Sequence, residues 1–176
     1  MKTQIILSFF FLVVTIAYAQ NTNSCPVPKD TLVIDTTNHQ AMLLGYINRQ
    51  AFQDTSFSWW FNSVYDMYEV DSTTALSLKN KLDSIKITVV MGTWCSDSHR
   101  EVPKLLRVFD YLNISVDRVS ILAVGRNKKG IRNETDGMNI ELVPTIIFYR
   151  NGIEVGRIVE SPKETIEKDM LKILSS

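Results

Sequence analysis

The sequence contains little cysteine and no excess of charge of either sign, and these shortages exclude several kinds of protein. Cys25 and Cys95 are the only cysteines among 176 residues, so a disulfide-dense scaffold is excluded and we expect a hydrophobic core. Together with His39 and His99 they lack the paired short spacings of structural zinc sites, so we expect no metal and no cofactor. The 19 basic residues equal the 19 acidic ones, which leaves no electrostatic basis for binding nucleic acid.

Long apolar runs are also scarce, and the one that stands out is near the N-terminus. Residues 5–17 are almost entirely apolar, follow the basic Lys2, and lead into a small-residue pattern that ends at Ala19. This pattern predicts a signal peptide over residues 1–19, cleaved after Ala19. The run is short for a membrane-spanning helix, which needs about 20 residues; an uncleaved anchor is the alternative. We therefore expect an exported protein, periplasmic or secreted, without stable membrane insertion after cleavage.

The rest of the chain is expected to form one domain. A composition of 45% hydrophobic and 22% charged residues is ordinary for a globular protein with a proper core. We expect residues 20–37 to be an extended leader with a short strand at residues 31–35, and residues 38–176 to be the folded domain. Within that domain, residues 38–70 are expected to be a helical extension.

This extension is rich in aromatic residues. Leu44, Ile47 and Ala51 have helical spacing, as do several of the aromatic residues that follow them. Large aromatic side chains mainly serve cores, so we expect these helices to pack against a sheet. A lid or a substrate platform is the alternative. The aromatic residues are Phe52, Phe57, Trp59, Trp60, Phe61, Tyr65 and Tyr68.

Patterns of strands and helices alternate after this extension. Asp71 is the expected N-cap of a helix, Asn151-Gly152 is typical of a two-residue hairpin turn, and a capping box at Ser161 predicts the last helix. The order is βαβ followed by ββα, which predicts an α/β fold whose central mixed sheet is flanked by helices. The expected elements are helix 72–84, strand 86–91, helix 96–111, strand 119–124, a strand from 143, strand 153–159 and a helix from 161.

Cys95 lies where a predicted buried strand gives way to a predicted helix. Unpaired amide groups and the positive end of the helix dipole favour a thiolate at such a position. Because the thiolate is the nucleophilic form of cysteine, Cys95 is the strongest candidate for a catalytic residue.

Motifs around this position resemble those of the thioredoxin family. Trp94-Cys95-Ser96-Asp97-Ser98 resembles the family's Trp-Cys-x-x-Cys motif, and Val143-Pro144-Thr145 resembles its segment with a cis-proline that faces the reactive thiol. The closing hairpin and helix match as well, so the resemblance covers roughly residues 71–176. Met91-Gly92-Thr93-Trp94-Cys95, with Glu101-Val102-Pro103, is similar to a subgroup of exported bacterial members.

The resemblance implies a thioredoxin-like fold and a role for each matched residue. Pro144 is expected to follow a cis peptide bond, and Val143 to offer its backbone to an extended substrate chain. Trp94 is expected to flank the reactive sulfur. The implied activity is thiol–disulfide exchange through Cys95, with exported protein or small-molecule thiols as partners.

Two departures from the family pattern bear on this activity. Ser98 occupies the position of the resolving cysteine, and Val89 occupies that of the acidic proton acceptor. Without the second thiol, a mixed disulfide on Cys95 needs another thiol for its release. The sequence is therefore compatible with two functions. One is a monothiol exchange enzyme, and the other is a non-catalytic thioredoxin-like module that binds extended peptides or a partner protein.

Of three polar neighbours, Ser98 is a candidate catalytic residue together with Cys95, and Asp97 and His99 are candidate modulators of the thiol. Ser98 is a candidate hydrogen-bond partner of the sulfur. Asp97 suits the first turn of a helix, but its charge opposes thiolate formation unless Arg100 offsets it. His99, four residues after Cys95, is either a source of positive charge and a proton shuttle, or a solvated surface residue.

Cys25 has three interpretations. It is a free thiol in the leader, a resolving partner for Cys95, or half of a fixed structural disulfide. Export and the even cysteine count favour pairing, but the sequence supplies no distance with which to choose.

Overall fold

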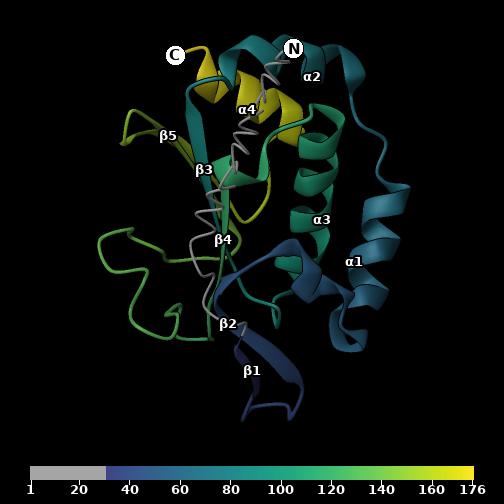
Figure 1. Cartoon of the computed structure of the whole chain (residues 1–176), viewed down its shortest axis with the longest axis vertical. Coiled ribbons are helices and arrows are strands. Elements are labelled where there is room, and N and C mark those ends of the chain that lie inside the picture. Colours follow the sequence, from purple (N-terminus) through teal and green to yellow (C-terminus); the bar gives the residue numbers. More distant parts are fainter. Residues whose placement is uncertain (1–30) are drawn as a thin grey trace, which may run out of the picture.

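The computed structural model describes residues 31–176, which form a six-stranded sheet and four α-helices (Figure 1). The predicted signal peptide and Cys25 lie outside the described residues. Within them, no helix combines the length and the apolar character needed to cross a membrane. The strands are β1 (Thr31–Ile34), β2 (Ala41–Ile47), β3 (Ile85–Met91), β4 (Val119–Ala123), β5 (Thr145–Arg150) and β6 (Ile153–Val159), and the α-helices are α1 (Thr55–Met67), α2 (Ser72–Leu78), α3 (Ser96–Tyr111) and α4 (Ile166–Leu174).

The strands follow the order β1-β2-β4-β3-β5-β6 across a mixed sheet. β3 and β4 run parallel and are connected by α3, whereas β5 pairs antiparallel with both β3 and β6, and α4 follows. At the β5–β6 turn, Asn151 and Gly152 have φ values of 53° and 80°, the positive angles that a type I′ turn requires. The expected order of βαβ and ββα units is therefore confirmed, and the fold is thioredoxin-like.

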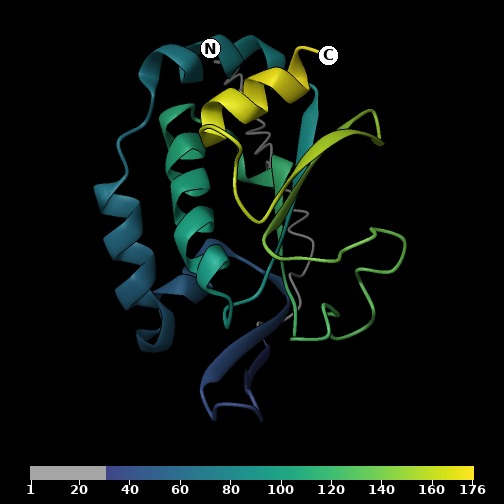
Figure 2. The same ribbon diagram turned by 180° about the vertical axis from the view of Figure 1, so that it is seen from behind.

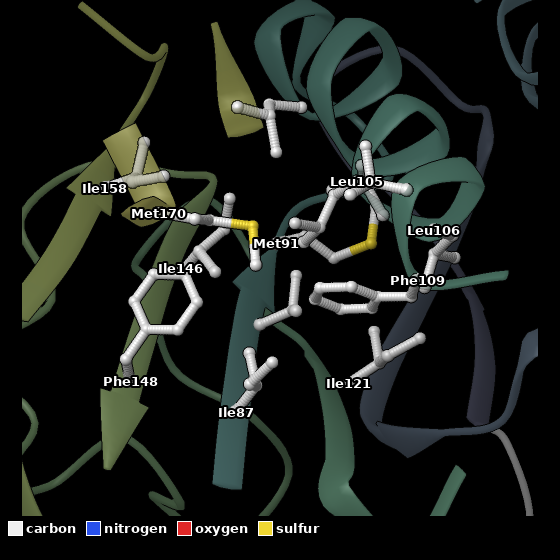
Figure 3. Close-up of a cluster of buried hydrophobic side chains, with 14 of the residues drawn as sticks. Ile87, Met91, Leu105, Leu106, Phe109, Ile121, Ile146, Phe148, Ile158 and Met170 are labelled. Atoms are coloured by element: carbon white, nitrogen blue, oxygen red, sulfur yellow. The ribbon is translucent and has the colours of Figure 1, made fainter. Parts of the chain in front are cut away.

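Alternate residues of the central strands face two separate hydrophobic clusters, because side chains of a strand point to opposite faces of a sheet. Ile87 and Met91 of β3 belong to the larger cluster, to which all four α-helices of the described chain contribute (Figure 3). Val90 points to the other face, where Met138 and Ile140 of the segment after β4 cover a smaller cluster. Figure 2 shows that segment on the side of the sheet away from α1 and α3. The expected burial of β3 on both faces is confirmed only at the end of the strand, because Lys86 is exposed and Thr88 is half-buried on the face that Val90 shares.

The aromatic residues of the N-terminal segment pack into the larger cluster, as predicted. The N-cap of α1 is Asp54, whose carboxylate accepts a hydrogen bond from the Ser56 amide at 2.8 Å. Phe61 stacks on Phe52 with ring centroids 4.7 Å apart, and both rings are buried. Trp59 is different, because it lies on the outer side of α1 and is 70% exposed.

The predicted helix around Leu44 and Ile47 is wrong, because this segment is strand β2. β2 pairs antiparallel with β1 on one side and with β4 on the other. These partners are distant in the sequence or across a turn, and their hydrogen bonds outweigh a chance helical spacing of apolar residues. The boundaries of the leader and of the helical extension are corrected accordingly: residues 31–34 and 41–47 extend the central sheet, and the helical part begins after Asn48.

Two helix boundaries also differ from the predicted ones. α4 does not begin with the capping box at Ser161; its N-cap is Thr165, whose hydroxyl accepts a hydrogen bond from the Lys168 amide. The amides of Lys163 and Glu164 are bound by the Asp169 carboxylate instead, which holds this segment as a turn. α2 has the expected N-cap, Asp71, but it gives way after Leu78 to a short 3₁₀ turn, so it is shorter than predicted.

Candidate functional site

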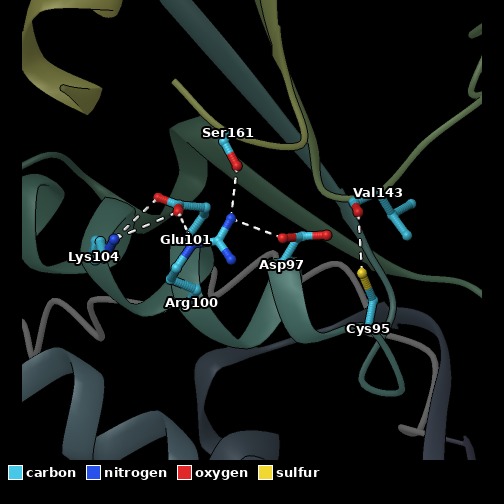
Figure 4. Close-up of polar contacts among 7 residues, drawn as sticks. All are labelled: Cys95, Asp97, Arg100, Glu101, Lys104, Val143 and Ser161. Carbon is cyan, nitrogen blue, oxygen red and sulfur yellow. Dashed lines mark hydrogen bonds and ion pairs between the residues drawn. The ribbon is translucent and has the colours of Figure 1, made fainter. Parts of the chain in front are cut away.

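Cys95 is the N-cap of α3, directly after the segment that follows β3. It is half-buried, and its thiol donates a hydrogen bond to the Val143 carbonyl, with 3.2 Å between sulfur and oxygen (Figure 4). The Val143–Pro144 peptide bond is cis. The two sequence motifs are thus adjacent in space, and the sulfur lies beside the backbone of the residue that precedes the proline.

Trp94 is held on one side of the thiol by contacts to the smaller cluster. Its indole N–H donates to the Val124 carbonyl at 2.8 Å, and the Arg126 guanidinium lies over its ring, 5.0 Å from the centroid. Arg126 in turn forms an ion pair of 2.8 Å with the buried carboxylate of Asp35. These contacts fix the orientation of the indole next to the reactive residue.

Thr93 connects the loop that carries Cys95 to strand β2, a role that the sequence analysis did not predict. Its hydroxyl oxygen accepts a hydrogen bond of 3.0 Å from the Leu43 amide of β2, and the threonine is buried. A buried amide without an acceptor is costly, so this bond anchors β2 against the thiol-bearing loop. The sequence shows a threonine directly before Trp94-Cys95, but it does not show that the hydroxyl of this threonine binds a backbone amide 50 residues away.

Ser98 is fully buried, and its hydroxyl oxygen accepts a hydrogen bond from the Gly92 amide at 3.2 Å. Its side chain therefore stabilises the turn between β3 and α3, while the thiol of Cys95 is bonded to the Val143 carbonyl. The geometry supports a structural role for Ser98 in holding this turn.

His99 packs against α1 and is not a solvated surface residue. Its Nε2 lies 2.7 Å from the Thr93 carbonyl oxygen, so this nitrogen carries the proton and donates it. Its ring stacks on Trp60 with centroids 4.1 Å apart. Burial lowers the pKa of His99 below its usual 6.5, although the hydrogen bond to Thr93 opposes the shift. These contacts favour the neutral ring, so they do not support a positive charge beside the thiol.

The partial burial of His99 predicts a loss of stability in mild acid. Because its folded pKa is lowered, the unfolded chain binds more protons near pH 6, and linkage then makes stability rise with pH. The contribution is complete above about pH 6.5 and is lost as the pH falls from there. The free energy of unfolding, measured by urea titration, should therefore fall between about pH 6.5 and pH 5. His99→Phe keeps a ring on Trp60 and should flatten this slope; an equally steep slope in that variant would contradict the prediction.

Asp97 and Arg100 form an ion pair in the first turns of α3. The distance between the Arg100 Nη2 and the Asp97 Oδ1 is 2.7 Å, so the arginine offsets the carboxylate next to the thiol. Arg100 also contacts Glu101, a buried carboxylate that the sequence did not single out as functional. Among residues 31–176, no group of three or more His, Cys, Asp or Glu side chains is arranged to hold a metal ion.

Comparisons with known proteins bear on the fold. Neither a family model nor a curated protein sequence matches the chain. A crystal structure of a protein of unknown function from Pseudomonas aeruginosa is similar, with a TM-score of 0.54 and 12% identity over 74% of this chain and 90% of that one. A thioredoxin from Aeropyrum pernix shares 22% identity over 53% of this chain and 73% of its own, with a TM-score of 0.34. At 12% identity, the likeness to the Pseudomonas aeruginosa structure concerns the fold and not the activity.

Proposed function

We propose that this protein is an exported monothiol thiol–disulfide exchange enzyme in which Cys95 is the nucleophile. The observation that carries the proposal is the position of its sulfur, at the N-terminus of α3 and 3.2 Å from the Val143 carbonyl beside the cis peptide bond. The partial exposure of Cys95 leaves room for a substrate disulfide to approach the sulfur.

The reaction has two displacement steps. The Cys95 thiolate attacks one sulfur of a substrate disulfide, forms a mixed disulfide with it, and releases the other sulfur as a thiolate. A second thiol then attacks the mixed disulfide. An external thiol attacks the substrate sulfur, which releases the Cys95 thiolate and leaves that thiol joined to the substrate. Cys25 instead attacks the Cys95 sulfur, which releases the substrate as a thiolate and leaves a Cys25–Cys95 disulfide that an external thiol must reduce. Trp94 flanks the reacting sulfur, and the backbone of Val143, held by the turn to Pro144, is available to an extended substrate chain once the Cys95 proton has left.

The second thiol comes either from a separate molecule or from Cys25. Leu32 pairs with Leu43, whose amide lies 3.0 Å from the hydroxyl oxygen of Thr93. Adding the bonds along this path places Leu32 within about 20 Å of Cys95. The seven residues from Cys25 to Leu32 span up to about 23 Å when extended, so covalent geometry allows Cys25 to reach the sulfur.

Trapping the thiols of the native protein tests this function. Rapid acid quenching and alkylation, followed by mass spectrometry of the peptides, should find a mixed disulfide on Cys95 after exposure to oxidised glutathione. Release of that disulfide by added thiol alone would indicate an external resolving thiol, and a Cys25–Cys95 peptide would indicate the internal one. A Cys95 that forms no mixed disulfide would contradict the enzyme and favour the non-catalytic peptide-binding module.

A further inference from the structure

Arg100 makes polar contacts with three residues, two on α3 and one in the segment after β6 (Figure 4). Its Nε lies 2.5 Å from the Oε1 of Glu101, and its Nη2 lies 2.7 Å from both the Asp97 carboxylate and the Ser161 hydroxyl. A guanidinium presents its donors in a rigid planar fork, so these contacts are made together from one fixed group. Arg100 thereby connects the first turns of α3 to the segment after β6.

That segment is itself bonded to the cis-proline turn. The Glu160 amide donates to the Pro144 carbonyl at 2.7 Å, and Ser161 is the next residue along the chain. Since Cys95 bonds the carbonyl of Val143, the contacts form a closed ring from the thiol through the proline turn and Arg100 back to α3. Both sides of the candidate site are therefore held in one network.

The position of Arg100 also affects the charge near Cys95. Asp97, two residues after the thiol and only one-third exposed, would by itself oppose formation of a neighbouring thiolate. Glu101 is nearly fully buried and adds a second negative charge in the same helix. Arg100 contacts both carboxylates, whereas Lys104 contacts only Glu101, at 3.4 Å. Arg100 is thus the cation paired with Asp97, the carboxylate two residues after Cys95.

In an extension that rests on the exchange function proposed above, we propose that Arg100 is a positioning residue that sets the reactivity of Cys95. It acts by neutralising Asp97, and its bond to Ser161, in the segment bonded to Pro144, holds the guanidinium in place to do so. It does not touch the sulfur or the substrate. Removing its charge leaves Asp97 unopposed next to the forming thiolate, which shifts thiolate formation to higher pH.

The test measures alkylation of Cys95 by iodoacetamide against pH, with mass spectrometry separating its peptide from that of Cys25. Arg100→Met should slow the reaction about three- to fivefold at pH 7 and move the whole profile to higher pH, as expected for one unscreened charge near the surface. Adding Asp97→Asn to this variant should bring the rate back to within about twofold of the unaltered protein. Arg100→Lys keeps the charge that opposes Asp97, so its rate should also stay within about twofold.

Lys104→Met is the matched control, because it removes a cation from Glu101 without touching Asp97; its profile should not move. Arg100→Gln makes the same charge change with hydrogen-bond donors retained, in case Arg100→Met fails to fold. An unchanged profile in the neutral variants, or a slowed reaction that Asp97→Asn does not restore, would overturn the proposal. Alkylation needs no disulfide substrate, so this result is separate from the success or failure of the exchange function itself.

Discussion

Cys95→Ser should reduce thiol–disulfide exchange to the uncatalysed rate, which is the largest effect on activity that the structure predicts. No other thiol is present in residues 31–176, and a serine hydroxyl does not attack a disulfide under these conditions. The measurement is the release of glutathione from a peptide that carries it as a mixed disulfide. The fold should be retained, because Cys95 is half-buried and its side chain makes no cap bond to α3.

Cys25→Ser is the matched control for this prediction. It removes a thiol with the same chemistry but leaves the first displacement step intact, so glutathione is still transferred to Cys95. If Cys25 resolves the mixed disulfide, this variant accumulates glutathionylated Cys95; if an external thiol does so, turnover is unchanged. Exchange that persists in Cys95→Ser at the unaltered rate would show that the activity belongs elsewhere, and the proposed mechanism would be wrong.

Local patterns in the sequence predicted the elements that carry the thiol. The helix predicted over residues 96–111 has the bounds of α3, and Cys95 is its N-cap, because helical spacing of apolar residues and the strand before it are encoded locally. The hairpin turn at Asn151 was predicted for the same reason: positive φ angles are required there and few residues adopt them readily.

Long-range contacts decided what the sequence pattern did not. β2 is a strand because β1 and β4 supply partners on both sides, and neither pairing is visible in the spacing of Leu44 and Ile47. α4 begins late because the side chain of Asp169 folds back onto two preceding amides, which competes with a capping box at Ser161.

The directions of side chains near the thiol were also beyond the sequence. Ser98 and His99 were both candidates to act on the sulfur from the first turn of α3. The hydroxyl oxygen of Ser98 accepts a hydrogen bond from the Gly92 amide. The imidazole of His99 donates to the Thr93 carbonyl and stacks on the ring of Trp60. Spacing on a helix placed these residues near Cys95, but partners from other segments determined where they point.

Trp60→Ala should destabilise the protein by about 3–5 kcal/mol, whereas Trp59→Ala should cost less than about 0.5 kcal/mol. The two residues are adjacent on α1 and have the same side chain, but Trp60 is 4% exposed and Trp59 is 70% exposed. Trp60 contacts the ring of Phe52 at a centroid distance of 5.8 Å in addition to its stack on His99. Truncation therefore leaves a cavity in the main core at one position and removes solvated surface at the other.

Urea unfolding followed by circular dichroism gives both free energies on the same scale. The comparison also tests the purpose of the aromatic helix, since a lid or platform would depend on exposed rings and a packing element on buried ones. A loss from Trp60→Ala that is no larger than that from Trp59→Ala would mean that α1 does not depend on this core contact. The expected difference instead makes α1 part of the main core, because the stacking of Trp60 on His99 links the helix to the turn of α3 that carries the thiol.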